Sequence, residues 1–231
     1  MEAVIHGILL AHILSGGVAL VAAPVAMVAT KGGEAHRKWG KAYFWAMTVV
    51  FVTALVLSIF KWIPFLLMIA VFSYYWVVSG YRWLYLKKLG SGTSPGMLDW
   101  AALTIALVFN LAFTAWGIIQ AISGNLGFYA YLAIGFGIGG LVVASGNLRR
   151  FLNNKDRNAW LFEHLGGMLG SYIAAVTAFS SQVFSFMPEL WQWIWPSIAG
   201  APVIAYTTYK YKKKISRNRK VEDLMTLKAE S

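Results

Sequence analysis

Glu163 and His164 stand next to each other inside the apolar run of residues 160–182, WLFEHLGGMLGSYIAAVTAFSSQ. Ionisable side chains at membrane depth are costly, so such a pair is a functional hypothesis by default. Histidine is suited to passing protons, because small changes in its environment switch its charge near neutral pH. The structural alternative is that Glu163 pairs with an arginine of a loop and His164 hydrogen-bonds a neighbouring helix.

Further polar side chains are expected between the membrane spans or at their inner ends. They are His12, His36, Arg37, Asn147, Arg149 and Arg157. We expect His12 to face the helix bundle from the first span, and the others to form a polar, basic vestibule around Glu163 and His164. Such a cluster favours binding or transport of a small solute, an anion or a proton through a polar site between the first and sixth spans.

A haem- or metal-binding redox site that uses His12, His36 and His164 is the alternative function. Counting about 1.5 Å per residue from the span ends places His12 and His164 at depths that differ by about 10 Å. Two axial haem ligands must lie at one level, and the ligands of a zinc site must lie within bond distance of the metal. The spacing therefore favours no cofactor, and the lack of cysteine excludes thiolate ligands.

Signatures of catalysis are missing from the sequence. No glycine-rich phosphate loop is present, and the apolar runs hold too few acidic residues for an aspartyl dyad. We therefore assign no catalytic residue and lean against an enzyme. A third alternative is a structural or lipid-interacting scaffold, whose polar cluster only holds helices together.

The composition is typical of a membrane protein. Of the 231 residues, 58% are hydrophobic and 13% are charged, whereas about a quarter of the residues in a soluble domain are charged. Seven apolar runs each approach the roughly 20 residues that cross a bilayer; they are residues 4–29, 41–60, 64–86, 99–122, 128–147, 159–182 and 189–209. The sequence predicts an all-α domain of seven transmembrane helices over residues 1–209 and a basic cytoplasmic tail over residues 210–231.

Positive charge predicts the orientation of these spans. Every Lys and Arg except Lys61 lies on the side of the connections after the first, third and fifth runs, or in the tail, so this side faces the cytoplasm. The N-terminus is then outside, and the first run is expected to be a retained helix because no basic segment precedes it. We expect the net charge of +11 to contact anionic lipids at the inner face, not nucleic acid. No oligomeric state is predicted.

Internal matches suggest a parallel repeat of three helices on either side of a central fourth, a 3+1+3 arrangement. Gly16-Gly17 matches Gly139-Gly140, and Trp39 matches Trp160. Small residues along one side of the first and sixth runs predict that both histidines, His12 and His164, face the bundle. Asp99 is expected to cap the start of the fourth helix, where a carboxylate interacts favourably with the helix dipole.

Four segments of the chain resemble a widespread group of bacterial multi-pass membrane proteins of unknown function. They are HRKWGKAYFWAM at residues 36–47, GNLRRF at 146–151, EHLGGMLGSYIAAVTAF at 163–179 and WPSIAGAPVIAY at 195–206. The resemblance covers most of the chain, supports the helical topology and implies a bacterial inner-membrane protein, but it brings no activity with it.

By the same resemblance, the recurring motifs contain His36, Arg37, Arg149, Arg150 and His164. The chain departs from them at two positions. Asn147 stands where such proteins often carry Asp, and Gly167 stands where an Arg is expected after the motif His. If that Asp and Arg serve a shared activity, this member has lost or altered it.

Overall fold

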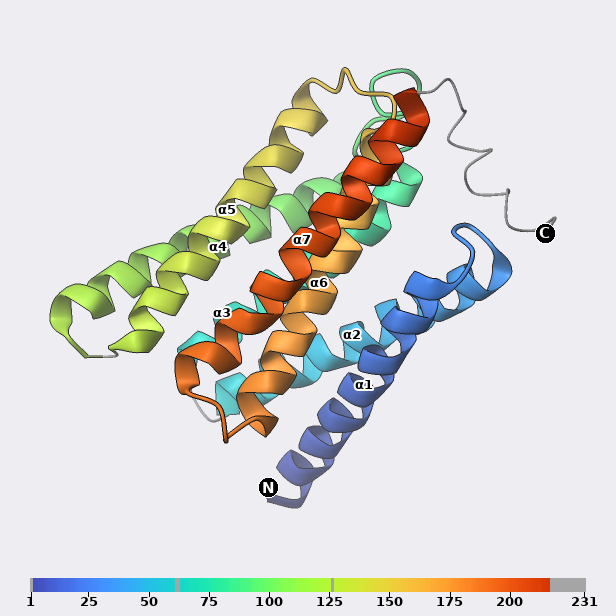
Figure 1. Cartoon of the computed structure of the whole chain (residues 1–231). Helices are drawn as coiled ribbons and strands as arrows, with labels where there is room; N and C mark the ends of the chain where they lie inside the picture. The colour runs from blue at the N-terminus through green and yellow to red at the C-terminus, as the bar shows by residue number, and fades with distance from the viewer. Residues whose placement is uncertain (1, 61–62, 126, 217–231) are drawn as a thin grey trace. The chain divides into compact units, whose positions relative to one another are not determined.

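The computed structural model describes residues 2–60, 63–125 and 127–216. Within these ranges the chain forms seven α-helices, one 3-10 turn and an isolated bridge between Leu89 and Thr93 (Figure 1). The elements are α1 (Glu2–Val28), α2 (Glu34–Phe60), α3 (Pro64–Arg82), η1 (Trp83–Tyr85), α4 (Met97–Ser123), α5 (Phe128–Leu152), α6 (Ala159–Val183) and α7 (Glu189–Ser216). The prediction of an all-α chain with seven helices is confirmed.

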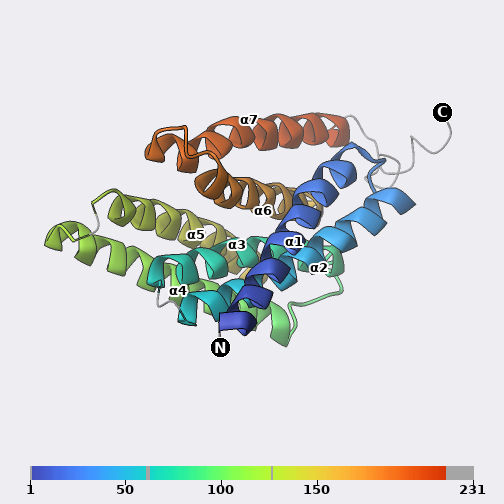
Figure 2. The same ribbon diagram turned by 90° about the horizontal axis from the view of Figure 1, so that it is seen from below.

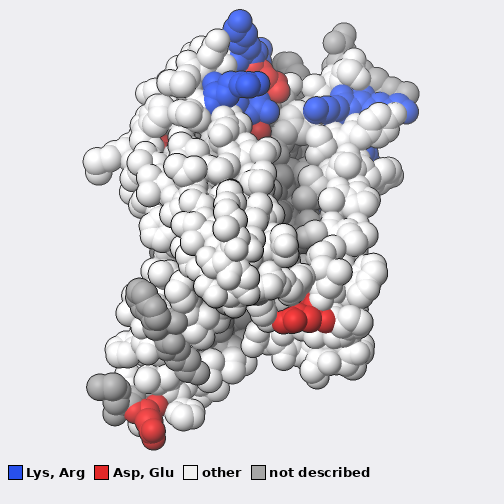
Figure 3. Space-filling view, turned by 90° about the vertical axis from the view of Figure 1, so that its left-hand side faces the viewer, with Lys and Arg blue, Asp and Glu red and all other residues white. Residues whose placement is uncertain are grey.

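Five helices in the described residues are long and apolar enough to cross a membrane: α1, α2, α3 continued by η1, α4 and α5. α6 and α7 are of similar length but are not among these five; α6 carries Glu163 and His164, and α7 ends in a run of lysines. Large apolar side chains are exposed on the helices; Leu14, Val108 and Val142 are 62%, 59% and 67% exposed. On the face drawn in Figure 3, charged side chains form a few clusters separated by wide uncharged surface. The chain is therefore a multi-pass membrane protein.

The start of α2 differs from the prediction. It begins at Glu34 and not at residue 41, so His36 and Arg37 lie in the first turn of a helix and not in a loop. Glu34 favours this earlier start, because a carboxylate is stabilised at the positive end of the helix dipole. The connection that precedes α2 is therefore much shorter than the basic loop expected from the sequence.

The ends of α5 and α7 also differ from the prediction. α5 continues to Leu152, beyond the expected residue 147, because Leu148 and Phe151 pack against a core that includes Tyr75. Arg149 is therefore a helical residue. α7 continues to Ser216, so the first part of the expected tail is helical, and residues 217–231 lie outside the described residues.

The chain divides into two compact units, and α2 and α6 contribute to both. Unit 2 comprises residues 51–167 and contains α3, α4 and α5. α4 and α5 lie side by side in it (Figure 1, Figure 2) and meet through small residues. A Cβ on Gly140 would overlap the Asn110 side chain, and a Cβ on Gly117 would lie 2.9 Å from the Ala130 carbonyl oxygen. Glycine here allows the close backbone approach by which membrane helices pack.

Unit 1 contains the described residues up to Val50 and from Met168 onward, that is α1, most of α2, most of α6, and α7. The Tyr43 hydroxyl is buried and lies 2.8 Å from Ser171 Oγ. Ser171 Oγ itself donates to the Met168 carbonyl, 2.9 Å away, so the tyrosine is the donor to the serine. A hydroxyl chain thus joins α2 to α6.

Proline changes the backbone bonding of unit 1. Pro24 lies inside α1 and has no N–H, so the Leu20 carbonyl lacks its helical donor. The Tyr172 hydroxyl of α6 donates to this carbonyl oxygen at 3.4 Å. The bond replaces in part the one that proline removes. α7 contains two interior prolines, Pro196 and Pro202.

Residues matched by the expected repeat have different surroundings. Trp39 is 37% exposed, whereas Trp160 is 8% exposed. A Cβ on Gly17 would meet nothing within 4 Å, whereas one on Gly140 would overlap Asn110. The 3+1+3 repeat stays a prediction.

Candidate functional site

The last turns of α3 and α5 and the first turns of α4 and α6 carry the polar contacts of unit 2, and we call this region the polar end. Arg82 of α3 forms a bidentate ion pair with Asp99 of α4, from Nε to Oδ1 at 2.7 Å and from Nη2 to Oδ2 at 2.9 Å. Asp99 Oδ2 also accepts the Gly96 backbone N–H at 2.8 Å. The helix begins at Met97 and not at residue 99, so Gly96 is the N-cap residue and Asp99 caps the helix from its third position. The Asp99 side chain is 1% exposed and accepts three hydrogen bonds, of which the two from Arg82 join α3 to α4.

Asn147 of α5 is the centre of a second contact with α3. Its Oδ1 accepts a hydrogen bond from Trp83 Nε1 at 3.1 Å. Its Nδ2 donates to the Tyr75 hydroxyl and to Ser79 Oγ, each at 2.8 Å. The amide is 1% exposed and bonded on both sides. Since a buried polar group is costly unless it is bonded, Asn147 serves chiefly to hold α5 against α3.

Glu163 and His164 each bond to a different helix. Arg150 Nε, in the last turn of α5, donates to Glu163 Oε1 at 2.6 Å, and the two side chains are 33% and 25% exposed. His164 Nδ1 lies 2.8 Å from the Gly80 carbonyl oxygen of α3. A carbonyl oxygen only accepts, so Nδ1 carries a proton and donates. These contacts match the structural alternative, except that the arginine is in a helix and not in a loop.

The helix contact beside His164 is close. A Cβ on Gly167 would lie 2.6 Å from Gly80 Cα and 3.0 Å from the Trp76 carbonyl oxygen, whereas one on Gly166 would meet nothing within 4 Å. The small-residue side of α6 therefore faces α3 at this point, as predicted. The arginine that the resemblance leads one to expect at position 167 would not fit against α3.

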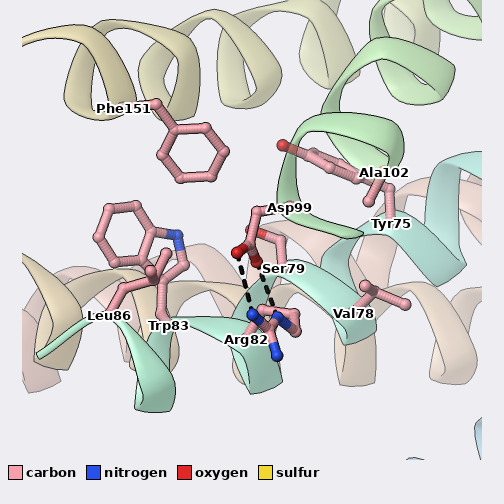
Figure 4. A pocket seen from close by; sticks show the side chains of 9 residues that line it. All are labelled: Tyr75, Val78, Ser79, Arg82, Trp83, Leu86, Asp99, Ala102 and Phe151. Atoms are coloured by element: carbon pink, nitrogen blue, oxygen red, sulfur yellow. Dashed lines mark hydrogen bonds and ion pairs between the residues drawn. The ribbon is translucent and has the colours of Figure 1, made fainter. Parts of the chain in front are cut away.

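A small pocket lies beside the Arg82–Asp99 pair. Figure 4 shows the guanidinium directed at the carboxylate, with the rings of Trp83 and Phe151 on one side of Asp99 and that of Tyr75 on the other. The space is at the lower limit for a single water molecule. Arg82 uses two of the five N–H bonds of a guanidinium on Asp99.

The remaining predicted residues of unit 2 do not take part in the ion pairs. Arg149 and Arg157 are both exposed, and it is Arg150 that contacts Glu163. Arg82 was not among the predicted site residues, and Asp99 was predicted only as a helix cap. The sequence contained a signal for this pairing, because Arg82 and Asp99 carry opposite charges at the facing ends of two successive apolar runs.

His12, His36 and Arg37 belong to unit 1. His12 hydrogen-bonds the backbone of Val50 on α2, and Arg37 is exposed. His36 Nδ1 lies 2.8 Å from the Ala26 carbonyl oxygen, near the end of α1. Lys31 donates to carbonyls of the same turn, and burial lowers the pKa of its ammonium group. His36 and Lys31 thus bond carbonyls in the last turn of α1, where the helix leaves its carbonyl groups without intrahelical donors.

The three histidines considered as ligands share one feature: each bonds the backbone of a neighbouring helix. Among the described residues, no group of three or more His, Cys, Asp or Glu side chains could hold a metal ion. Haem or metal binding by His12, His36 and His164 stays a prediction.

No protein-family model matches the chain, and neither a curated protein nor a solved structure matches it significantly. The resemblance to bacterial multi-pass membrane proteins therefore rests on the four sequence segments alone.

Proposed function

We propose that this multi-pass membrane protein binds a small anionic solute at the polar end of unit 2 and transports it across the bilayer. The observation that carries the proposal is the partly exposed ion pair between Arg150 and Glu163. Glu163 directly precedes His164 in the chain. Because the side chains of Arg150 and Glu163 are both partly exposed, water competes with their ion pair, so it opens at a lower cost than a pair whose carboxylate is buried. Solvent or a solute can therefore reach a guanidinium that is poised to accept a new partner.

The two ion pairs of the polar end differ in a way that assigns their roles. Asp99 is buried and held by Arg82 and by the Gly96 N–H, so it is a fixed structural group. Within the described residues, the one ion pair of Glu163 is with Arg150. An anion that binds Arg150 displaces Glu163, and the released carboxylate then takes up a proton more readily because it has lost a nearby positive charge. Glu163, next to His164, is thus the proposed titrating group.

The orientation follows from the basic residues of unit 2. Those that the structure describes lie in the last turn of α3, in the connection between α3 and α4, in the last turn of α5, and in the connection between α5 and α6, at the polar end: Arg82, Lys87, Lys88, Arg149, Arg150, Lys155 and Arg157. Lys61 lies outside the described residues. Positive charge gathers on the cytoplasmic side of inner-membrane proteins. We propose seven spans, completed by α6 and α7, with the polar end and the C-terminus in the cytoplasm and the N-terminus outside.

Flux measurements on the purified full chain in liposomes test the proposal. Uptake of small inorganic and organic anions, and the accompanying change of internal pH, are followed for the unsubstituted protein, for Glu163→Gln and for the control Glu34→Gln. Glu34 is also a carboxylate near a helix start, but it lies on α2 in the other unit. We expect Glu163→Gln to abolish proton-coupled anion flux and Glu34→Gln to leave it unchanged.

Absence of flux in the unsubstituted protein, or equal flux in the two variants, would contradict the proposal. The absorption spectrum and metal content of the same preparation test the alternative use of His12, His36 and His164. A Soret band or a stoichiometric metal would replace transport by a redox function.

A further inference from the structure

Unit 1 contains an apolar groove that the proposed transport does not use. It is lined by α6, α7 and the last turn of α1, and its volume is about 240 Å³. Its walls include Met27, Ile173, Val176, Ala199 and Val203. An apolar cavity of about 150 Å³ is already large enough to hold benzene. This groove therefore has room for a substantial stretch of hydrocarbon.

The sequence of α7 explains why the groove is open. α6 and α7 lie side by side (Figure 1, Figure 2), and Gly200 lies so close to Ile173 that a Cβ there would overlap the isoleucine side chain. Small Ala199 beside this contact leaves space that a larger residue would fill. Pro196 lines the groove one turn earlier and removes a backbone hydrogen bond from the helix.

One end of the groove leads to amino groups. Met27, in the wall, precedes Lys31 by four residues, and Lys31 Nζ donates to the Met27 carbonyl. Val203, in the wall of α7, precedes Lys210 by seven residues and Lys214 by eleven, and both spacings keep these lysines on the face of the helix that lines the groove. At about 1.5 Å per residue, Lys210 lies roughly 10 Å beyond Val203 along the helix.

We propose that the groove binds an acyl chain of an anionic phospholipid whose head group lies against Lys31, Lys210 and Lys214. The apolar walls suit the hydrocarbon, and the amino groups at one end complement a phosphate. The length of helix between wall and lysines fits a lipid with its chain along α7 and its head group at the membrane surface. This site does not rest on the proposed transport, because none of its residues belongs to unit 2.

Native mass spectrometry of the full chain in mild detergent tests the site, with phosphatidylglycerol and phosphatidylcholine as probes. Ala199→Phe fills the groove, and Ile198→Phe is the matched control, since Ile198 is the preceding residue, 56% exposed and absent from the groove wall. We expect the unsubstituted protein and Ile198→Phe to retain phosphatidylglycerol in preference to phosphatidylcholine. Ala199→Phe should lose the bound lipid.

A second pair of variants tests the head-group contact without altering the groove. Lys210→Glu combined with Lys214→Glu should abolish the preference for the anionic lipid, whereas Lys88→Glu combined with Lys155→Glu, exposed positions in unit 2, should keep it. The unfolding midpoint of every variant in lipid-free detergent shows that it is folded, and the lysine pair alone decides the test if Ala199→Phe does not fold. Equal retention of both lipids by the unsubstituted protein, or an unchanged preference in the lysine variant, would overturn the proposal.

Discussion

The two units of the molecule are stabilised by different kinds of polar contact. In unit 2, Arg82 pairs with Asp99, Arg150 pairs with Glu163, and Asn147 bonds three side chains of α3 and η1. In unit 1, the polar contacts between helices are hydroxyl and imidazole bonds, as at Tyr43 and Tyr172. Both ion pairs found in the described residues thus belong to unit 2.

The two units also differ in how closely their helices pack. Helices of unit 2 meet at several glycines where even a methyl group would overlap a neighbour, as at Gly140 and Gly167, whereas unit 1 has one such helix contact in the described residues, Gly200 against Ile173. Unit 1 contains the interior prolines Pro24, Pro196 and Pro202 and leaves an apolar groove between its helices. Charged pairs need fixed partners at short distance, and closely packed helices supply them. The looser unit instead offers space that a lipid chain can fill.

Of the substitutions that test this comparison, Asp99→Ala is expected to lower the free energy of unfolding most. It leaves Arg82 without its partner and removes the acceptor of the Gly96 N–H. Because Arg82 is 29% exposed and can reach water, we expect a loss of about 3 kcal/mol in the free energy of unfolding, the low end for a broken buried pair. Glu163→Ala breaks the more exposed pair and should cost less, about 1 kcal/mol. Unfolding in mixed micelles measures both, and equal losses would remove the distinction between a fixed and an exchangeable pair.

A somewhat smaller effect is expected from Gly167→Ala. The new Cβ would lie 2.6 Å from Gly80 Cα, so α3 and α6 must separate, and overpacking of this kind costs about 1–3 kcal/mol. Gly166→Ala is the matched control, since its Cβ meets nothing within 4 Å and alanine favours a helix over glycine by about 1 kcal/mol. Thermal unfolding in detergent measures both variants, and only Gly167→Ala should have a lower midpoint temperature than the unsubstituted protein. If both midpoints moved together, the close packing assigned to unit 2 would be wrong.

The smallest effect is expected from Tyr172→Phe in unit 1. The change removes the hydroxyl that donates to the Leu20 carbonyl, and one such bond contributes about 0.5–1.5 kcal/mol. Pro24→Ala restores a helical N–H for that carbonyl, so Tyr172→Phe should cost less in the Pro24→Ala background. A double-mutant cycle on the unfolding free energy measures the coupling. Additive losses would show that the tyrosine does not compensate for the proline.

Much of the architecture was predictable because it depends on local sequence. Seven apolar runs of membrane-spanning length predicted the seven helices, and the predicted starts of the third, fifth, sixth and seventh agree with the structure. The boundaries that were wrong lie where polar residues continue a helix beyond its apolar run, as at His36 and Arg149. Hydropathy indicates which residues can lie in the hydrocarbon core of the membrane, whereas a helix ends where its backbone hydrogen bonding ends.

The sequence by itself determined that Glu163 and His164 lie together at the start of a helix, among basic residues and at an energetic cost in an apolar run. Only the tertiary structure decided their partners, Arg150 and the Gly80 carbonyl. Those partners depend on the distance and register between α6 and its neighbours. Both are set by close contacts such as Gly167 against Gly80, between residues far apart in the chain. Residue spacing within one helix does not contain that information.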